Sequence, residues 1–131
     1  MQMPQSMLYS AEHLWTKATT DGLWEAGITD YAQDLLGDII FIDAPAVGSD
    51  LVAGKPCGLV ESVKTGSDLH ALVDGKVIEV NQTLINSPEL INEKPYQAWI
   101  FKYKPSESYN DGDIGKKLLS ADAYQALIDG L

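Results

Sequence analysis

Short apolar runs separated by turn residues recur along most of the chain. The runs suited to β-strands cover residues 13–18, 23–28, 39–42, 51–53, 58–63, 69–73, 76–80 and 96–103. The first two flank a Thr-Thr-Asp-Gly turn signal and are predicted to form a hairpin. Strands this short, with turn signals every eight to twelve residues or so, favour a compact β sandwich or barrel.

Two segments carry helix signals instead. Thr29 is a good N-cap for residues 30–36, and Gly37 stands where a helix-ending glycine is expected. Ser120 can cap a second helix over residues 121–129. An apolar face around this C-terminal helix could dock on the sheets; it comprises Leu118, Leu119, Tyr124, Leu127 and Ile128.

The segments outside these strands and helices do not mark a boundary between domains. Residues 1–8 carry no charged side chain and are interpreted as a loose lead-in to the domain. Residues 81–92 are loop-like, with a turn or helix start at Ser87-Pro88. No linker rich in Pro, Gly or Ser separates domains, so residues 9–131 are predicted to form one domain.

Composition narrows the possible partners. The 131 residues have a net charge of −10 and a pI of about 4.3. This charge argues against nucleic acid and anionic membranes, which would be repelled. It suits partners with basic patches, or serves only solubility. With no long apolar segment, no signal-peptide pattern and one cysteine, the chain is expected in the cytoplasm.

One polar hairpin tip interrupts the apolar pattern. Lys64 opens the segment Lys-Thr-Gly-Ser-Asp at residues 64–68, between the runs that end at Val63 and begin at Leu69. These small and polar residues are typical of a turn. Lys64 is therefore expected to project into solvent, where a lysine is usually only a solvated charge.

The sequence around this lysine resembles the glycine cleavage system H protein family. The similar segments occur in the family's order at residues 9–13, 27–33, 36–39, 61–68, 75–81 and 87–92, followed by Pro95-Tyr96. Six segments in register make the resemblance specific over residues 9–128.

The resemblance implies a mainly β fold with a few helices. This fold is the lipoyl-domain-like flattened barrel of two sheets, or barrel-sandwich hybrid, with a C-terminal helix. Lys64 aligns with the lysine that bears lipoic acid as an amide, so the chain would be a non-catalytic carrier. Glu61, Ser67 and Asp68 would take part in recognition of the hairpin, although solubility alone could explain Glu61 and Asp68.

The implied partners follow from the same resemblance. A lipoate–protein ligase or lipoyl synthesis enzymes would modify Lys64, and dihydrolipoamide dehydrogenase would reoxidise the arm. The arm would serve either the glycine cleavage enzymes or, in related lipoate-binding proteins of bacterial sulfur oxidation, a heterodisulfide-reductase-like complex.

Leu14 is the most informative departure from the family pattern. Glycine cleavage H proteins usually have a glutamate there, which helps to hold an amine carried by the arm. Leucine cannot accept a hydrogen bond from an ammonium group. Leu14 therefore indicates either drift within a working glycine cleavage carrier or a carrier adapted to sulfur oxidation. Smaller departures are Thr65, Leu72 and Ala98.

Other chemistry finds less support in the sequence. Biotin carriers typically flank the modified lysine with methionines, but Val63 and Thr65 flank Lys64 here. A lysine that forms a Schiff base needs a dry pocket, which a polar hairpin tip does not supply. Cys57, His70 and His13 are better explained as structural residues than as catalysts, and the three tryptophans as packing residues. An unmodified interaction domain or a small hydrolase or transferase remain alternatives, but no catalytic set or metal-ligand spacing is present.

Overall fold

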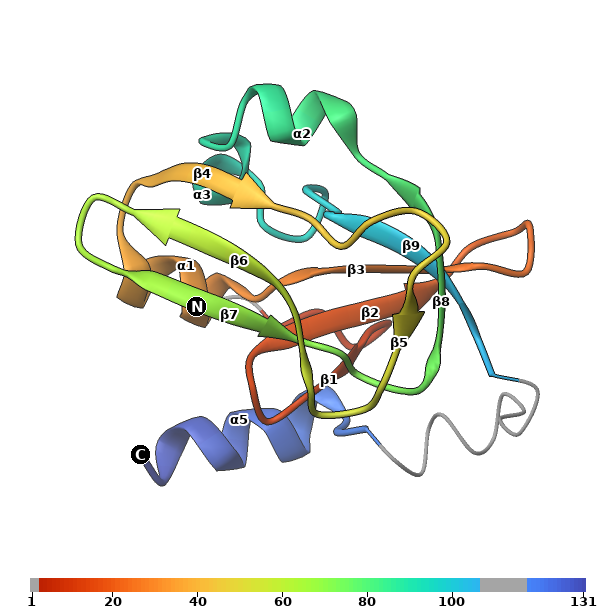
Figure 1. Cartoon of the computed structure of the whole chain (residues 1–131). Helices are drawn as coiled ribbons and strands as arrows, with labels where there is room; N and C mark the ends of the chain where they lie inside the picture. The colour runs from red at the N-terminus through yellow and green to blue at the C-terminus, as the bar shows by residue number, and fades with distance from the viewer. Residues whose placement is uncertain (1–2, 107–117) are drawn as a thin grey trace.

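Two antiparallel β-sheets and a few short helices form the molecule (Figure 1). The computed structural model describes residues 3–106 and 118–131. The larger sheet has the strand order β1-β2-β3-β9-β8-β5 and the smaller one β4-β6-β7. The strands are β1 (Leu8–Tyr9), β2 (Leu14–Ala18), β3 (Trp24–Ile28), β4 (Ile39–Asp43), β5 (Asp50–Leu51), β6 (Pro56–Ser62), β7 (Gly66–His70), β8 (Gly75–Val80) and β9 (Phe101–Pro105). The predicted fold class is confirmed.

The smaller sheet carries the polar hairpin tip. Strands β6 and β7 pair with Glu61 opposite Gly66 and Leu59 opposite Asp68. Because side chains alternate between the two faces of a strand, Val60 and Ser62 point inward and are buried, whereas Leu59 and Glu61 point outward. The turn between these strands lies at the left of Figure 1, while β5 and β8 lie at the right.

The space between the sheets holds the main hydrophobic core. Leu14, Ile39, Val60, Leu69 and Phe101 are among its fully or nearly fully buried side chains. Burial of this apolar surface is the main driving force for closing one sheet over the other, worth about 25 cal/mol per Å².

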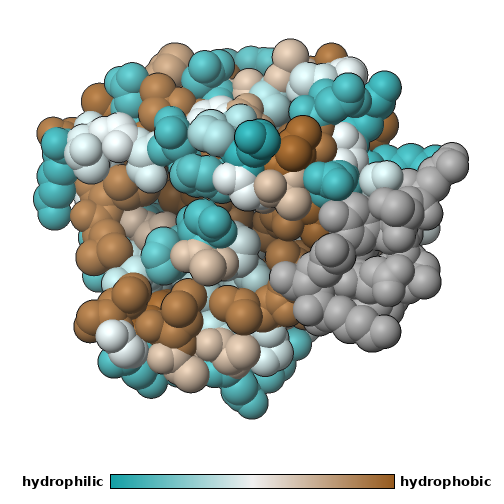
Figure 2. All heavy atoms as spheres, turned by 60° about the horizontal axis from the view of Figure 1, so that its bottom comes forward, coloured by the Kyte–Doolittle hydropathy of each residue, from teal (hydrophilic) through white to brown (hydrophobic). Residues whose placement is uncertain are grey.

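A second cluster lies under helix α5 (Ala121–Asp129). Tyr124 stacks on Tyr9 with ring centroids 4.8 Å apart, and both side chains are fully buried. Leu119, Leu127 and Ile128 pack against this cluster, which agrees with the predicted docking of the C-terminal helix. Figure 2 brings the lower side of Figure 1 forward and shows that apolar side chains gather toward the lower left of this face.

The short helices depart most from the sequence prediction. Helix α1 (Asp30–Leu36) is found where expected. Residues 81–92 were predicted to be loop-like apart from a turn or helix start at residues 87–88, but contain α2 (Gln82–Asn86) and α3 (Leu90–Glu93). Asn81 caps α2, because its side-chain oxygen accepts a hydrogen bond from the Leu84 amide at 3.3 Å.

Strand boundaries also differ from prediction. The run at residues 96–103 becomes a strand only from Phe101, because the amides of Gln97 and Ala98 both donate to the Lys94 carbonyl at 3.0 Å and so form a turn. The run at residues 69–73 belongs to a strand only up to His70. The division into a lead-in over residues 1–8 and a domain over residues 9–131 stays a prediction, and Met7 is already buried.

Gly58 offers a test of how closely β4 and β6 approach. A Cβ at this position would lie 2.5 Å from the carbonyl oxygen of Asp43, which is backbone and cannot easily give way. We expect Gly58→Ala to lower the free energy of unfolding by about 1–3 kcal/mol, measured by urea denaturation.

Gly66→Ala is the matched control, because the nearest atom to its Cβ would be 3.6 Å away, an ordinary contact. Equal stability of the two variants would show that the approach of Asp43 does not constrain residue 58.

Candidate functional site

The turn that carries Lys64 is held by Ser62. The Ser62 hydroxyl oxygen accepts hydrogen bonds from the amides of Lys64 at 3.1 Å and Thr65 at 3.2 Å. The Ser62 amide donates to the Thr65 carbonyl at 2.8 Å. Since Ser62 itself is buried, the backbone of the tip is fixed although its side chains are exposed. The sequence prediction did not single out Ser62.

The turn is also anchored to the start of β4. The Val63 amide donates to the Asp38 carbonyl at 3.0 Å. Asn92, from α3, reaches the same corner: its amide nitrogen donates to the Gln33 side chain and to the Gly37 carbonyl, both at 2.9 Å. Its side-chain oxygen accepts from the Ile39 amide at 2.9 Å. The tip therefore rests on a corner that α1, β4 and α3 build together.

The Lys64 side chain is exposed and lies across Gly37. Its Cε, Cδ and Nζ atoms are 3.3, 3.6 and 3.7 Å from the point that a Cβ would occupy at Gly37. Gly37 ends α1 with φ +80°, a backbone conformation that residues other than glycine rarely adopt. The glycine thus allows this backbone and leaves room for the lysine stem.

An apolar cleft of about 120 Å³ begins beside this corner. Its walls are Leu14, Ile28, Ala32, Leu35, Leu36, Val60 and Leu69, and its polar residues are Glu12, His13, Ser67 and Asp68. Leu36 directly precedes Gly37, and Asp68 follows Lys64 by four residues. At about 3.3 Å per residue, the backbone of Asp68, at one rim of the cleft, lies at most about 13 Å from that of Lys64.

The predicted recognition residues do not form one group. Ser67 and Asp68 line the cleft, whereas Glu61 points to the outer face of the small sheet, opposite Gly66. All three side chains are exposed. Only Ser67 and Asp68 therefore lie where an arm in the cleft could meet them.

His13 lines the cleft and is tied to the C-terminal helix. Its Nδ1 is 2.7 Å from the Tyr124 hydroxyl, which lies 2.8 Å from the Thr29 hydroxyl. Burial raises the pKa of Tyr124 to about 12, so this phenol stays protonated near neutral pH. His13 has φ 71°. The network fixes His13 to α1 and α5, which gives it a structural role.

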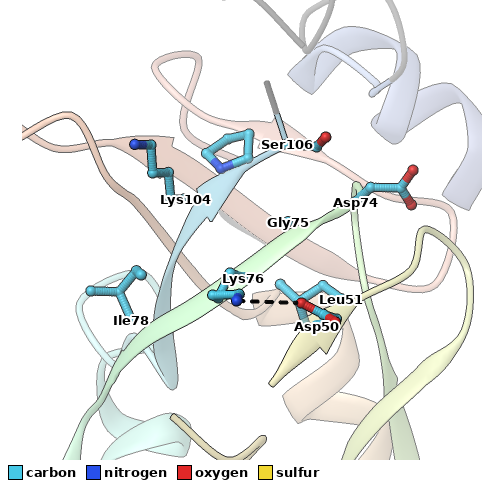
Figure 3. Close-up of a pocket in the computed structure, with 9 residues that line it drawn as sticks. Asp50, Leu51, Asp74, Gly75, Lys76, Ile78, Lys104 and Ser106 are labelled. Atoms are coloured by element: carbon cyan, nitrogen blue, oxygen red, sulfur yellow. Dashed lines mark ion pairs between the residues drawn. The ribbon is translucent and has the colours of Figure 1, made fainter. Parts of the chain in front are cut away.

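A second cavity and Cys57 do not belong to this site. A larger cavity of about 440 Å³ is lined by charges of both signs, with Lys76 paired to Asp50 at 3.9 Å (Figure 3). Both side chains of this pair are largely exposed, so the ion pair contributes little. Burial raises the pKa of the Cys57 thiol to about 11, which disfavours a reactive thiolate.

Neither a metal-binding cluster nor a membrane-spanning helix is found in the described part of the chain. Within residues 3–106 and 118–131, no three His, Cys, Asp or Glu side chains gather as a metal site. None of the helices in that part of the chain has the length and apolar character of a membrane span.

The environment of His13 predicts a pH dependence of stability. Burial lowers the pKa of His13 below its usual value of about 6.5, although Glu12 opposes this. The unfolded chain therefore binds a proton at a higher pH than the folded chain does. The free energy of unfolding should fall as pH decreases through about 6.5 toward the lowered folded pKa.

Urea denaturation at about pH 7.5 and about pH 5.5 measures this loss. His13→Asn should reduce it, because asparagine tolerates positive φ and does not titrate. His70→Asn removes the other histidine and is the matched control. An unchanged pH dependence in His13→Asn would assign the loss to other groups.

Comparison with known proteins points to one family over nearly the whole chain. Residues 7–130 match the family model described as Glycine cleavage H-protein. A glycine cleavage system H protein from Methylobacillus flagellatus is 53% identical over 98% of this chain and 99% of its own length. One from Escherichia coli O7:K1 is 45% identical over 97% and 96%. The crystal structure of the Mycobacterium marinum protein matches with a TM-score of 0.83 and 37% identity, over 98% and 99%.

These comparisons decide between the pathways that the sequence left open. Proteins of this family carry a covalent lipoyl-lysine and are non-catalytic carriers of the glycine cleavage system. None of the comparisons supports the sulfur oxidation alternative. The chain belongs to the glycine cleavage H-protein family.

Proposed function

We propose that Lys64 is the residue to which lipoic acid is attached. The observation that carries the proposal is the position of its side chain, exposed on a fixed turn and directed over Gly37. A fixed turn presents one amine at a defined place, which an acylating enzyme can find without ordering a loop. No other exposed lysine in the described residues lies on the β6–β7 turn.

The residues around Lys64 fit such a group. Attachment converts the ammonium into an amide and removes one positive charge, so no buried counter-charge is needed. The turn residues Thr65, Gly66 and Ser67 are small and exposed, which leaves the amine accessible from several directions. When bound, lipoic acid supplies a five-membered disulfide that accepts electrons and a transferred group.

The apolar cleft is the resting place that we propose for the end of the arm. An extended lipoyl-lysine reaches roughly 14 Å from its Cα, which exceeds the distance of at most about 13 Å between the backbones of Lys64 and Asp68 at the rim of the cleft. The walls bury apolar atoms, and the volume of about 120 Å³ is small compared with ordinary ligand pockets of about 300–1,000 Å³. Ser67 and Asp68 supply polar atoms at the rim.

Leu14 makes this cleft more apolar than the family pattern does. The side chain is 1% exposed and lies opposite Ile28 in the β2–β3 hairpin. Among the described residues, the carboxylates that line the cleft are those of Glu12 and Asp68, and both side chains are exposed. An ammonium group on the arm would lack the buried acceptor that glutamate provides, and would be held less tightly.

The individual partner enzymes are part of the same proposal. The glycine cleavage enzymes would exchange groups with the arm, and dihydrolipoamide dehydrogenase would reoxidise it. A lipoate–protein ligase or lipoyl synthesis enzymes would modify Lys64. The cytoplasmic location stays a prediction from the sequence.

Substitution of Lys64 tests the attachment site. On co-expression with a lipoate–protein ligase and supplied lipoate, the wild-type protein should gain the mass of one lipoyl group. Lys64→Arg should gain none, because the guanidinium group is not acylated under these conditions. Intact-protein mass spectrometry gives the result.

Lys55→Arg is the matched control, since Lys55 is also exposed and precedes the same hairpin. It should be modified like the wild type. An unmodified wild-type protein, or a modified Lys64→Arg protein, would contradict the assignment.

Substitution of Leu14 tests the cleft. Leu14→Glu should support glycine-dependent decarboxylation by the partner enzyme more strongly than the wild type, because its carboxylate can accept from an ammonium group. The same change should lower the free energy of unfolding of the unmodified protein by about 1–3 kcal/mol, since it places a polar group in a buried site. Steady-state kinetics and urea denaturation measure the two effects.

Leu14→Gln is the control for polarity without charge. It should lose stability without matching the gain in activity. Equal activity of wild type, Gln and Glu proteins would show that residue 14 does not meet the arm.

A further inference from the structure

Strand β4 exposes two consecutive apolar side chains. Its register with β6 shifts between Ile39, opposite Ser62, and Phe41, opposite Glu61. One extra residue therefore enters β4 as a bulge, which breaks the alternation of the strand. Ile40 is 57% exposed and Phe41 is 49% exposed, while Ile39 and Ile42 remain in the core.

These side chains continue an apolar surface on the outer side of β6. Leu59 lies two residues before Glu61 and shares its face of β6, and Val63 directly follows the end of β6 at the start of the turn. Val63 is 63% exposed and Leu59 is half-buried. We call Ile40, Phe41, Leu59 and Val63 the outer hairpin face. It flanks the Lys64 turn on the side of the small sheet away from the core.

Carboxylates border this apolar surface. Glu61 lies opposite Phe41, and Asp43 lies opposite Leu59; both are exposed. Strands β4, β6 and β7, which the structure describes completely, contain no lysine or arginine. The face is therefore complementary to an apolar surface that is bordered by basic side chains.

The reach of Lys64 indicates which partner must cover this face. An unmodified lysine extends about 6 Å from Cα to Nζ, from ordinary bond lengths. The lipoylated arm extends roughly 14 Å, so enzymes that act on its end can remain at a distance. An enzyme that acylates the amine has to approach the turn closely, and its surface must then contact the flanks of the hairpin.

We propose that the outer hairpin face is the docking surface for the enzyme that acylates Lys64. The inference rests on the proposed attachment at Lys64. The occupant is a protein whose active-site entrance has an apolar patch flanked by Lys or Arg side chains. In the step that it catalyses, the Lys64 nitrogen forms an amide bond to the carbonyl carbon of an activated lipoic acid. The bond from that carbon to its leaving group breaks, and the ammonium loses its extra proton and one more to form the amide.

Acylation kinetics with a lipoate–protein ligase test the docking surface. Phe41→Ser should raise the KM for the unmodified carrier about tenfold or more, as expected for the loss of a large apolar anchor, and change kcat little. Val52→Ser is the matched control, because Val52 is 48% exposed but lies outside the hairpin. Ile40→Ser should act in the same direction as Phe41→Ser, and urea denaturation confirms that each variant is folded.

Direct binding separates this inference from the attachment proposal. Calorimetric titration of the ligase with Lys64→Arg protein measures docking without reaction. The double variant Lys64→Arg/Phe41→Ser should bind the ligase more weakly, by the same factor by which Phe41→Ser raises the KM. Salt should weaken docking, and Asp43→Asn with Glu61→Gln should reduce that salt dependence.

The outcomes are distinct. If Phe41→Ser and Val52→Ser proteins are bound and acylated equally well, the docking surface is wrong while Lys64 remains the acceptor. If the wild-type protein is not acylated at Lys64, the attachment proposal fails, and the titration alone then decides whether the face binds the ligase.

Discussion

The seating of the β6–β7 turn on the corner between α1 and β4 is the constraint on which the site depends. The Val63 amide donates to the Asp38 carbonyl, and the Asn92 side chain donates to the Gly37 carbonyl and accepts from the Ile39 amide. Each bond satisfies a backbone group that would otherwise be left at the end of a helix or strand. Through these contacts the hairpin tip is a rigid extension of the sheets rather than a free loop. An attached arm would therefore start from a fixed point.

The hairpin separates two kinds of surface by strand alternation alone. Inward residues such as Val60 and Leu69 form the core and a wall of the cleft. Of the outward residues of β6, Leu59 belongs to the outer hairpin face and Glu61 borders it. Since the side chains of a strand alternate with period two, a partner on the outer face does not meet Val60 or Leu69, while Asp68, opposite Leu59, lies at the boundary between the two surfaces. The bulge in β4 adds Ile40 and Phe41 to the outer side without removing Ile39 or Ile42 from the core.

Local signals in the sequence predicted the parts that depend on local physics. Helix α1 was predicted from Thr29 and Gly37 because capping acts within a few residues; the Thr29 hydroxyl accepts from the Ala32 amide at 3.2 Å. Helices α2 and α3 have five and four residues, too few for a helical period to show. The apolar run at residues 96–103 indicated burial correctly but not its conformation.

The site was predictable only where its residues are neighbours in the chain. The small, polar composition of residues 64–68 predicted the exposed turn, and the family resemblance identified Lys64. Ser62 acts on amides two and three residues away, and a serine two residues before a turn is a weak but usable signal. The contact of Lys64 with Gly37, the hydrogen bonds of Asn92 to Gly37 and Ile39, and the cleft itself join distant segments. Spacing along one sequence carries no information about such contacts.

The C-terminal helix completes the cleft from a distance of more than a hundred residues along the chain. The Tyr124 hydroxyl lies between His13 and Thr29, so one phenol fixes both the residue before β2 and the N-cap of α1. Those two elements contribute Leu14, Ala32 and Leu36 to the cleft walls. The raised pKa of Tyr124, about 12, keeps the phenol protonated, so its hydrogen bonds persist across the neutral range. Helix α5 therefore holds two elements that line the cleft, although it does not line the cleft itself.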